Sequence, residues 1–214
     1  MSSQPATDAV AEVLAALSYG QRRAAMRAEA NVDLSPTLIA RRRQEQIAAH
    51  EHERADVIHR RLAELTKAGL EQRFAPFFDA VFAHTEPADW LEAQTWHYVG
   101  DALVRDLADA LSPSMDPRSA EVTEQVLADR DDQESFALDE ITRIVGADGE
   151  ARERVAAYAR RVIGESLTQT RRALDATGAI RRLVGGEEQE KHMLLDLLQR
   201  HRQRLDRLGI ERVE

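Results

Sequence analysis

Apolar side chains recur every three or four residues along most of this chain, the spacing that gives a helix one apolar face. No segment shows the two-residue alternation of a half-buried strand. Capping residues, proline and glycine punctuate the pattern at Ser35-Pro36, Pro87, Asp116 and Gly185-Gly186. The predicted helices cover residues 8–30, 36–67, 72–83, 88–111, 118–145, 150–176 and 187–208. The pattern therefore predicts an all-α antiparallel bundle of about six long helices. We expect residues 8–210 to form a single domain after a flexible amino terminus over residues 1–7.

The short predicted helix over residues 72–83 concentrates aromatic side chains. It and its start carry four of the five phenylalanines of the chain: Phe74, Phe77, Phe78 and Phe82. We expect this segment to close one end of the bundle as a hydrophobic plug. An exposed aromatic site for a partner is the alternative.

The composition limits the functional classes that fit. The formal net charge of -9 argues against a general nucleic-acid surface, because such surfaces bind by neutralising phosphates. Basic runs such as Arg41-Arg42-Arg43 lie in mixed-charge helices, so we interpret them as solvated faces. The chain has no cysteine, no secretory signal and no apolar run of about 18 residues, so we expect a cytoplasmic protein without a membrane partner. Glycine-rich phosphate loops and the hydrolase elbow motif do not occur in the sequence.

A carboxylate interrupts the apolar face of the predicted second helix. At about 3.6 residues per turn, that face carries Ile47, Glu51, Ala55, Ile58 and Leu62. Burying Glu51 is costly unless a metal ion, a cation or a hydrogen-bond donor meets it. Inward carboxylates on long helices hold di-iron sites in bundle proteins, often as Glu-x-x-His. Here the residue three positions after Glu51 is Arg54, so only half of that motif is present.

Three other predicted helices each carry one polar residue within an apolar stripe, namely Gln21, Asp101 and Asp129. Sites in helical bundles draw their ligands from facing helices, so one polar residue on each of four helices favours a shared site. Separate salt bridges and boundary positions are the alternative.

A second group of possible metal ligands lies beside Glu51 in the sequence. His52, Asp56 and His59 share a helix face at a workable metal spacing, but this face is turned away from the apolar stripe. We therefore interpret the trio as a solvent boundary, with a structural metal as the alternative. His201 lies near the apolar side of the last predicted helix, and we expect it to be partly buried and not a ligand.

The order and spacing of several short motifs resemble a known family. The motifs are Ser18-Tyr19-Gly20, Ala48-Ala49-x-Glu51, Asp89-Trp90-Leu91-Glu92, Tyr98-Val99-Gly100-Asp101, Val126-Leu127-Ala128-Asp129 and Arg161-x-x-Gly164-Glu165-x-Leu167-x-Gln169. Over about residues 10–208 the chain resembles the actinobacterial ferritin-like proteins related to the tRNA-(2-methylthio-N6-isopentenyladenosine) hydroxylases, called MiaE-like. The resemblance implies a ferritin-like bundle.

The resemblance also implies positions for a di-iron site, which the hydroxylases build from Glu, Glu-x-x-His, Glu and Glu-x-x-His on four helices. By position, Glu51 and Asp101 match the second and third carboxylates, while Asp129 and Asp132 stand where the last motif is expected. These four are the remnant ligand positions. Gln21 replaces the first glutamate.

Arg54 replaces the first histidine of the implied ligand set. We expect its guanidinium to bridge Glu51 and either Asp101 or Asp129, supplying the positive charge that iron supplies in the hydroxylases. The alternative is that Arg54 extends into solvent.

Because the implied ligand set is incomplete, we expect a non-catalytic binding or structural protein without a cofactor. Its partner is an unidentified protein or a second copy of the chain, and we do not expect tRNA to bind. The alternative is a di-iron oxygenase or hydroxylase, with tRNA as a substrate to test. A metal-buffering protein that uses exposed carboxylates is a third hypothesis.

Overall fold

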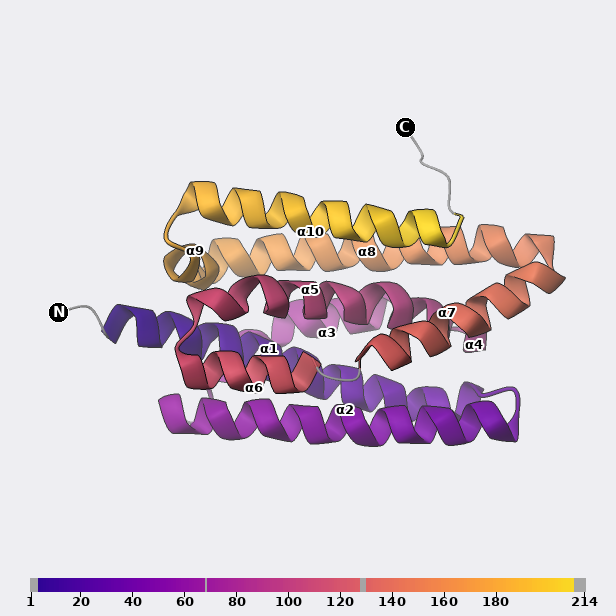
Figure 1. Ribbon diagram of the computed structural model, residues 1–214, viewed down its shortest axis with the longest axis horizontal. Coiled ribbons are helices and arrows are strands. Elements are labelled where there is room, and N and C mark those ends of the chain that lie inside the picture. Colours follow the sequence, from indigo (N-terminus) through magenta and orange to yellow (C-terminus); the bar gives the residue numbers. More distant parts are fainter. Residues whose placement is uncertain (1–3, 68, 128–129, 210–214) are drawn as a thin grey trace.

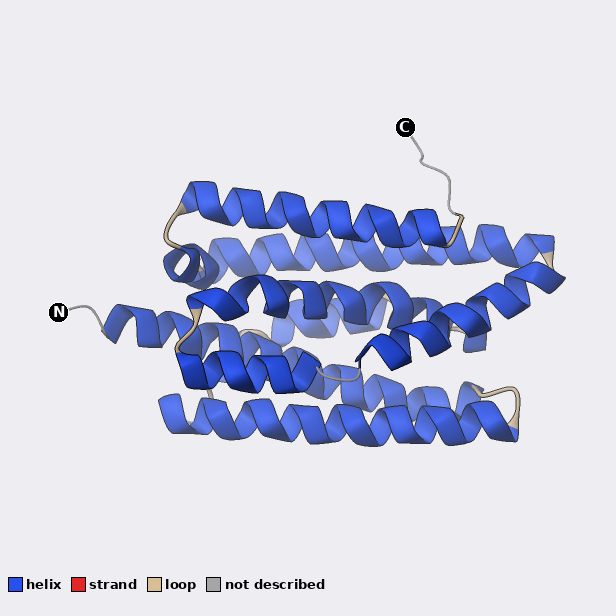
Figure 2. Cartoon of the chain, in the orientation of Figure 1, coloured by secondary structure: helices blue, strands red, loops and turns tan. Residues whose placement is uncertain are grey.

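The computed structural model describes residues 4–67, 69–127 and 130–209, and within these ranges the chain forms helices and no strand (Figures 1 and 2). The longer helices are α1 (Gln4–Ala30), α2 (Leu38–Leu65), α7 (Arg130–Ala147), α8 (Gly149–Thr177) and α10 (Glu187–Arg207). The shorter helices are α3 (Ala75–His84), α4 (Trp90–Trp96), α5 (Ala102–Leu111), α6 (Pro117–Leu127) and α9 (Ala179–Val184). Single turns connect them: η1 (Asn31–Leu34), η2 (Leu70–Arg73), η3 (His97–Asp101) and η4 (Ser112–Ser114).

The helices form an antiparallel bundle, as predicted. Figure 1 shows α1 and α2 running back along each other on one side, and α8 and α10 on the other, with α5 between the two pairs. The α1–α2 pair is the most extensive helix contact of the described chain. Among the described residues, no helix is long and apolar enough to cross a membrane.

Two predicted helices have a different internal structure from the one expected. The segment over residues 88–111 is α4 and α5 joined by η3, a π-helical turn. The segment over residues 118–145 is two helices, α6 and α7, which point in different directions in Figure 1. The two helices have different partners, because α6 packs on α2 and α5 whereas α7 packs on α4 and α8. The periodic pattern alone does not show this change of partner.

The helix ends are set by capping residues, some of them not the predicted ones. Thr37, and not Ser35, caps α2 by accepting the N–H of a residue in its first turn. The helix predicted over residues 88–111 begins after Asp89, two residues beyond Pro87, because the Asp89 carboxylate accepts a backbone N–H of α4. Asp116 accepts the backbone N–H of a residue in the first turn of α6, as predicted. Helix α1 begins at Gln4, earlier than the expected start at residue 8.

The apolar faces predicted for the first two helices are buried. On α2, the whole stripe of Ile47, Glu51, Ala55, Ile58 and Leu62 is shielded from solvent. On α1, Gln21 is buried together with the apolar residues of its face. The sequence pattern therefore placed two polar residues, Gln21 and Glu51, correctly inside the bundle.

The phenylalanine-rich segment is not the hydrophobic plug at one end of the bundle that the sequence predicts. Helix α3 packs lengthwise between α1 and α8. The rings of Phe74, Phe77, Phe78 and Phe82 line an internal cavity between these helices. The rings lie inside the bundle because two longer helices cover α3 along its length.

Candidate functional site

Glu51 is the centre of a buried polar contact between α1 and α2. Only 1% of the residue is exposed. Its Oε1 atom accepts a hydrogen bond of 2.7 Å from Nη1 of Arg54, and its Oε2 atom accepts one from Nε2 of Gln21. Three of the residues that the sequence singled out are therefore brought together. Both oxygens of the carboxylate are engaged by donors from the protein.

The Arg54 guanidinium bends inward to meet Glu51. The side chains of Arg54 and Glu51 are 9% and 2% exposed, so the ion pair is inside the bundle. The two residues lie three positions apart on α2, which places them on neighbouring faces of the same helix. The predicted bridge is confirmed at its Glu51 end, the arginine does not extend into solvent, and the other end, at Asp101 or Asp129, stays a prediction. The predicted bridge to Asp129 lies outside the described residues.

The other predicted ligand positions have different surroundings. Asp101 ends the π-helical turn, and its Oδ2 atom lies 2.8 Å from Nδ1 of His97. Asp132 lies on the surface of α7, where its side chain is 73% exposed and pairs with Arg43. The structure therefore does not bring Asp132 to the Glu51–Arg54 pair.

A chain of buried polar side chains that we did not predict leads to Asp101. Nε2 of His97 lies 3.2 Å from Nε2 of Gln44 and 3.3 Å from Nδ2 of Asn31. Gln44 also donates to the backbone carbonyl of Ala28 and accepts from the Gln94 amide, which fixes the orientation of its own amide. Gln44 and Gln94 are fully buried and Asn31 is 1% exposed, so these contacts hold the helices together from inside.

This network sets the tautomer of His97. Both contacts at Nε2 come from amide NH2 groups, which only donate, so Nε2 is the acceptor. The proton of the neutral ring is therefore on Nδ1, and it is donated to the Asp101 carboxylate. A signal for this cluster exists in the sequence, because Gln94, His97 and Asp101 follow one another at intervals of three and four residues.

The exposed trio beside Glu51 behaves as a solvent boundary. His52, Asp56 and His59 are exposed. Nδ1 of His59 lies 3.2 Å from the buried carboxylate of Glu71, which also accepts from Ser18. Burial alone raises the pKa of Glu71, but the hydrogen bonds from Ser18 and His59 outweigh it and hold this pKa below its ordinary value. Within the trio, His59 therefore contributes a structural contact between α2 and η2.

The donor set around Glu51 does not fit a di-iron centre. Such a centre takes four carboxylates and two histidines from facing helices. Here Gln21 offers a neutral amide and Arg54 a fixed positive charge, and both are hydrogen-bonded to the Glu51 carboxylate. Within residues 4–67, 69–127 and 130–209, no three His, Asp or Glu side chains are placed to share a metal ion. A guanidinium also repels a divalent cation at this position.

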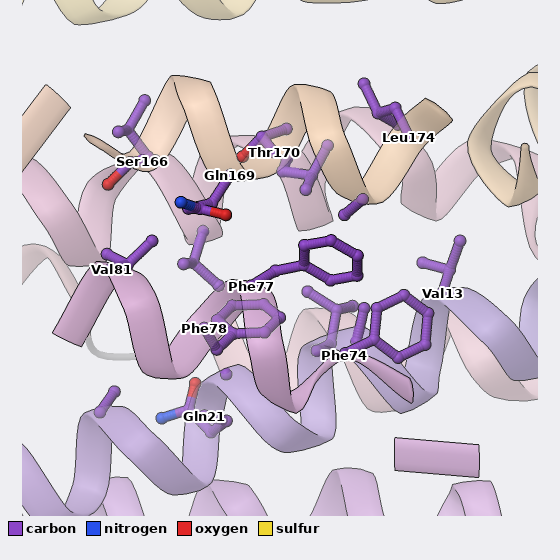
Figure 3. Close-up of a pocket in the computed structure, with 18 of the residues that line it drawn as sticks. Val13, Gln21, Phe74, Phe77, Phe78, Val81, Ser166, Gln169, Thr170 and Leu174 are labelled. Atoms are coloured by element: carbon purple, nitrogen blue, oxygen red, sulfur yellow. The ribbon is translucent and has the colours of Figure 1, made fainter. Parts of the chain in front are cut away.

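An apolar cavity lies on the other side of Gln21. It has a volume of about 140 Å³, is partly open to solvent, and is lined mainly by α1, α3, α5 and α8, with Trp96 of α4 and Ile180 of α9 completing the wall (Figure 3). Figure 3 shows the rings of Phe74, Phe77 and Phe78 on one side of this space and Gln169 and Leu174 of α8 on the other. Gln21 and Asp101 are among the few polar residues in its wall. The cavity therefore touches the Glu51 group at Gln21 and the His97 network at Asp101, but neither Glu51 nor Arg54 lines it.

Comparison with known proteins agrees with this architecture. A solved structure described as "Protein 19 with aldehyde deformylating oxidase activity from Synechococcus" matches with a TM-score of 0.76 and 18% sequence identity, covering 98% of this chain and 93% of that chain. At this identity the likeness shows the fold alone, and it confirms the ferritin-like bundle. No curated protein matches the sequence. A ferritin-like domain described for actinomycetes matches residues 5–187, which is most of the chain, and the chain therefore belongs to this ferritin-like family.

Proposed function

We propose that this chain is a non-catalytic binding protein, in which the buried Arg54–Glu51 ion pair takes the position that a metal centre occupies in di-iron members of the fold. The observation that carries the proposal is the 2.7 Å hydrogen bond from Arg54 to a carboxylate that is itself buried. A bundle that loses its metal retains inward carboxylates, which need protons or another cation. The guanidinium supplies that cation from within the chain.

Under this proposal, the pair allows the bundle to fold without a metal ion. An arginine keeps its charge at all physiological pH values, so the compensation of Glu51 is permanent. Gln21 adds a neutral donor from α1, which links the two helices at the same point. We propose on this basis that the chain has no resident metal cofactor and that its function is to bind another molecule.

The rival function is a di-iron oxygenase, either of the kind named for the Synechococcus protein or of the MiaE-like kind suggested by the sequence motifs. One observation favours it: an apolar cavity lies directly beside Gln21 and Asp101. An oxygenase of this type needs Glu51 free to bind metal, whereas both of its oxygens accept hydrogen bonds from the protein. The oxygenase therefore ranks second.

Titration with Co²⁺ in the absence of oxygen tests the proposal, since d–d absorption bands report protein ligands on this ion. We expect no stoichiometric binding by the native chain. A Gln21→Glu/Arg54→His variant rebuilds one carboxylate and one histidine of the implied ligand set, and we expect it to bind Co²⁺ more tightly than the native chain. Stoichiometric binding by the native chain, abolished by Glu51→Gln, would overturn the proposal.

A further inference from the structure

We propose that the cavity between α1, α3, α5 and α8 binds a linear, uncharged alkyl molecule that has one hydrogen-bonding end. The proposal goes beyond the function proposed above, because neither Glu51 nor Arg54 lines the cavity. The two proposals can therefore fail separately.

The size of the cavity points to a ligand. Native cores contain few voids larger than a water molecule. The volume of about 140 Å³ is close to that of an engineered apolar cavity of about 150 Å³ that stays dry and binds benzene. A ligand that fits such a space gains dispersion contacts with the apolar side chains that line it.

The shape of the cavity favours a linear ligand. Its lining on α1 extends from Glu12 to Ala24, which corresponds to about 18 Å of helix axis. A volume of about 140 Å³ spread along that length leaves a narrow space. The wall on the α3 side is fixed by close packing, because a Cβ atom at Gly20 would lie 2.5 Å from Cε1 of Phe78. The ring of Phe78 therefore rests directly on the α1 backbone.

The charges in the wall exclude an anion. The charged residues that line the cavity are Glu12 and Asp101, and no Lys, Arg or His is among the lining residues. Arg73 and Arg182 lie beside the wall, but both pair with Glu12, so a fatty-acid carboxylate would meet like charge and would have to displace Glu12 to reach a cation. An uncharged end group avoids this cost.

A neutral polar end has partners on α8. Ser166, Gln169 and Thr170 line the cavity with groups that both donate and accept hydrogen bonds. Figure 3 shows these three residues on α8, with Gln169 extending toward the phenylalanine side of the cavity. A few polar groups in an otherwise apolar wall are typical of a small-molecule site, where they orient the ligand.

The experiment measures binding of 1-butanol, 1-hexanol and hexanoate at pH 7.5. One of the two tryptophans, Trp96, lines the cavity, so a Trp90→Phe background makes its fluorescence a local probe. We expect saturable binding of 1-hexanol, roughly fifteenfold tighter than that of 1-butanol, since each of the two additional buried methylenes contributes about fourfold in affinity. Hexanoate should bind at least tenfold more weakly than 1-hexanol.

Filling the cavity should abolish this binding. Ala173→Leu on α8 adds a side chain at the wall, whereas Ala156→Leu changes another half-buried alanine of α8 that faces the second core cluster. We expect Ala173→Leu to weaken 1-hexanol binding at least tenfold and Ala156→Leu to leave it unchanged. If Ala173→Leu does not fold by circular dichroism, Ala16→Leu on α1 serves in its place. Absence of saturable binding, equal affinity for hexanoate, or full binding by the filled variant would overturn the proposal.

Discussion

Replacing Arg54 by alanine removes the cation from the centre of the bundle. The lost hydrogen bond joins two charged groups, a type of bond worth about 1.5–3 kcal/mol. The Glu51 carboxylate, only 2% exposed at its side chain, is then left without the guanidinium, and breaking a buried pair in this way costs about 3–5 kcal/mol. Gln21 still donates to the other oxygen, so we place the loss at about 3–4 kcal/mol, toward the lower end of that range. The corresponding fall in Tm is about 6–16 °C for a chain of this length.

Urea denaturation followed by circular dichroism measures this loss in the free energy of unfolding. The matched control is Arg41→Ala, which removes an exposed i,i+4 pair with Glu45 on the same helix and should cost at most about 1 kcal/mol. A Glu51→Gln/Arg54→Ala double variant should recover part of the loss, because the orphaned charge is removed as well. A loss below about 0.5 kcal/mol for Arg54→Ala, the size expected at an ordinary surface position, would refute the reasoning.

Three further predictions concern other parts of the chain. Burial lowers the pKa of His201 from 6.5 to about 4, so its contribution to stability is complete above pH 6.5 and is lost as the pH falls toward 4. Between pH 6.5 and pH 4, the free energy of unfolding from urea denaturation should fall by about 3 kcal/mol more in the native chain than in His201→Leu. An equal fall in the two proteins would contradict this. Tyr158→Phe should cost only about 1 kcal/mol by thermal denaturation, because Arg27 also donates to the Thr85 carbonyl that Tyr158 contacts, whereas a loss above about 3 kcal/mol would show that Arg27 does not compensate. In a filter-binding assay, bulk tRNA should bind weakly and be released as salt rises, while tight binding at physiological salt would favour the hydroxylase.

The buried stripes could be predicted from the sequence because helical periodicity fixes which residues share a face. Gln21 and Glu51 were identified as interior polar residues on this basis alone. The pairing of Arg54 with Glu51 followed from the cost of an uncompensated buried carboxylate together with a spacing of three residues. Helical periodicity and the pairing of residues three positions apart act within a single helix, so the sequence alone is sufficient to predict these contacts.

Apart from the spacing of Gln94, His97 and Asp101, the network around His97 could not be predicted, because it depends on contacts between distant segments. Asn31, Gln44 and Gln94 come from three different elements, and nothing local indicates that their amides meet one imidazole. The π-helical turn that holds His97 and Asp101 also changes the helical register by one residue, which a regular 3.6-residue pattern does not reveal. The cavity could not be predicted for the same reason, since its volume depends on side chains from six helices of the described chain.

Iron content per chain tests the central claim most directly. The chain would be expressed in iron-supplemented medium, purified without chelator, and analysed by inductively coupled plasma mass spectrometry. If the Arg54–Glu51 pair stands in the position of the metal centre, the purified native protein should contain only trace iron, at the level of the Glu51→Gln variant. Two iron atoms per chain, lost in Glu51→Gln, would contradict the account and establish a di-iron protein.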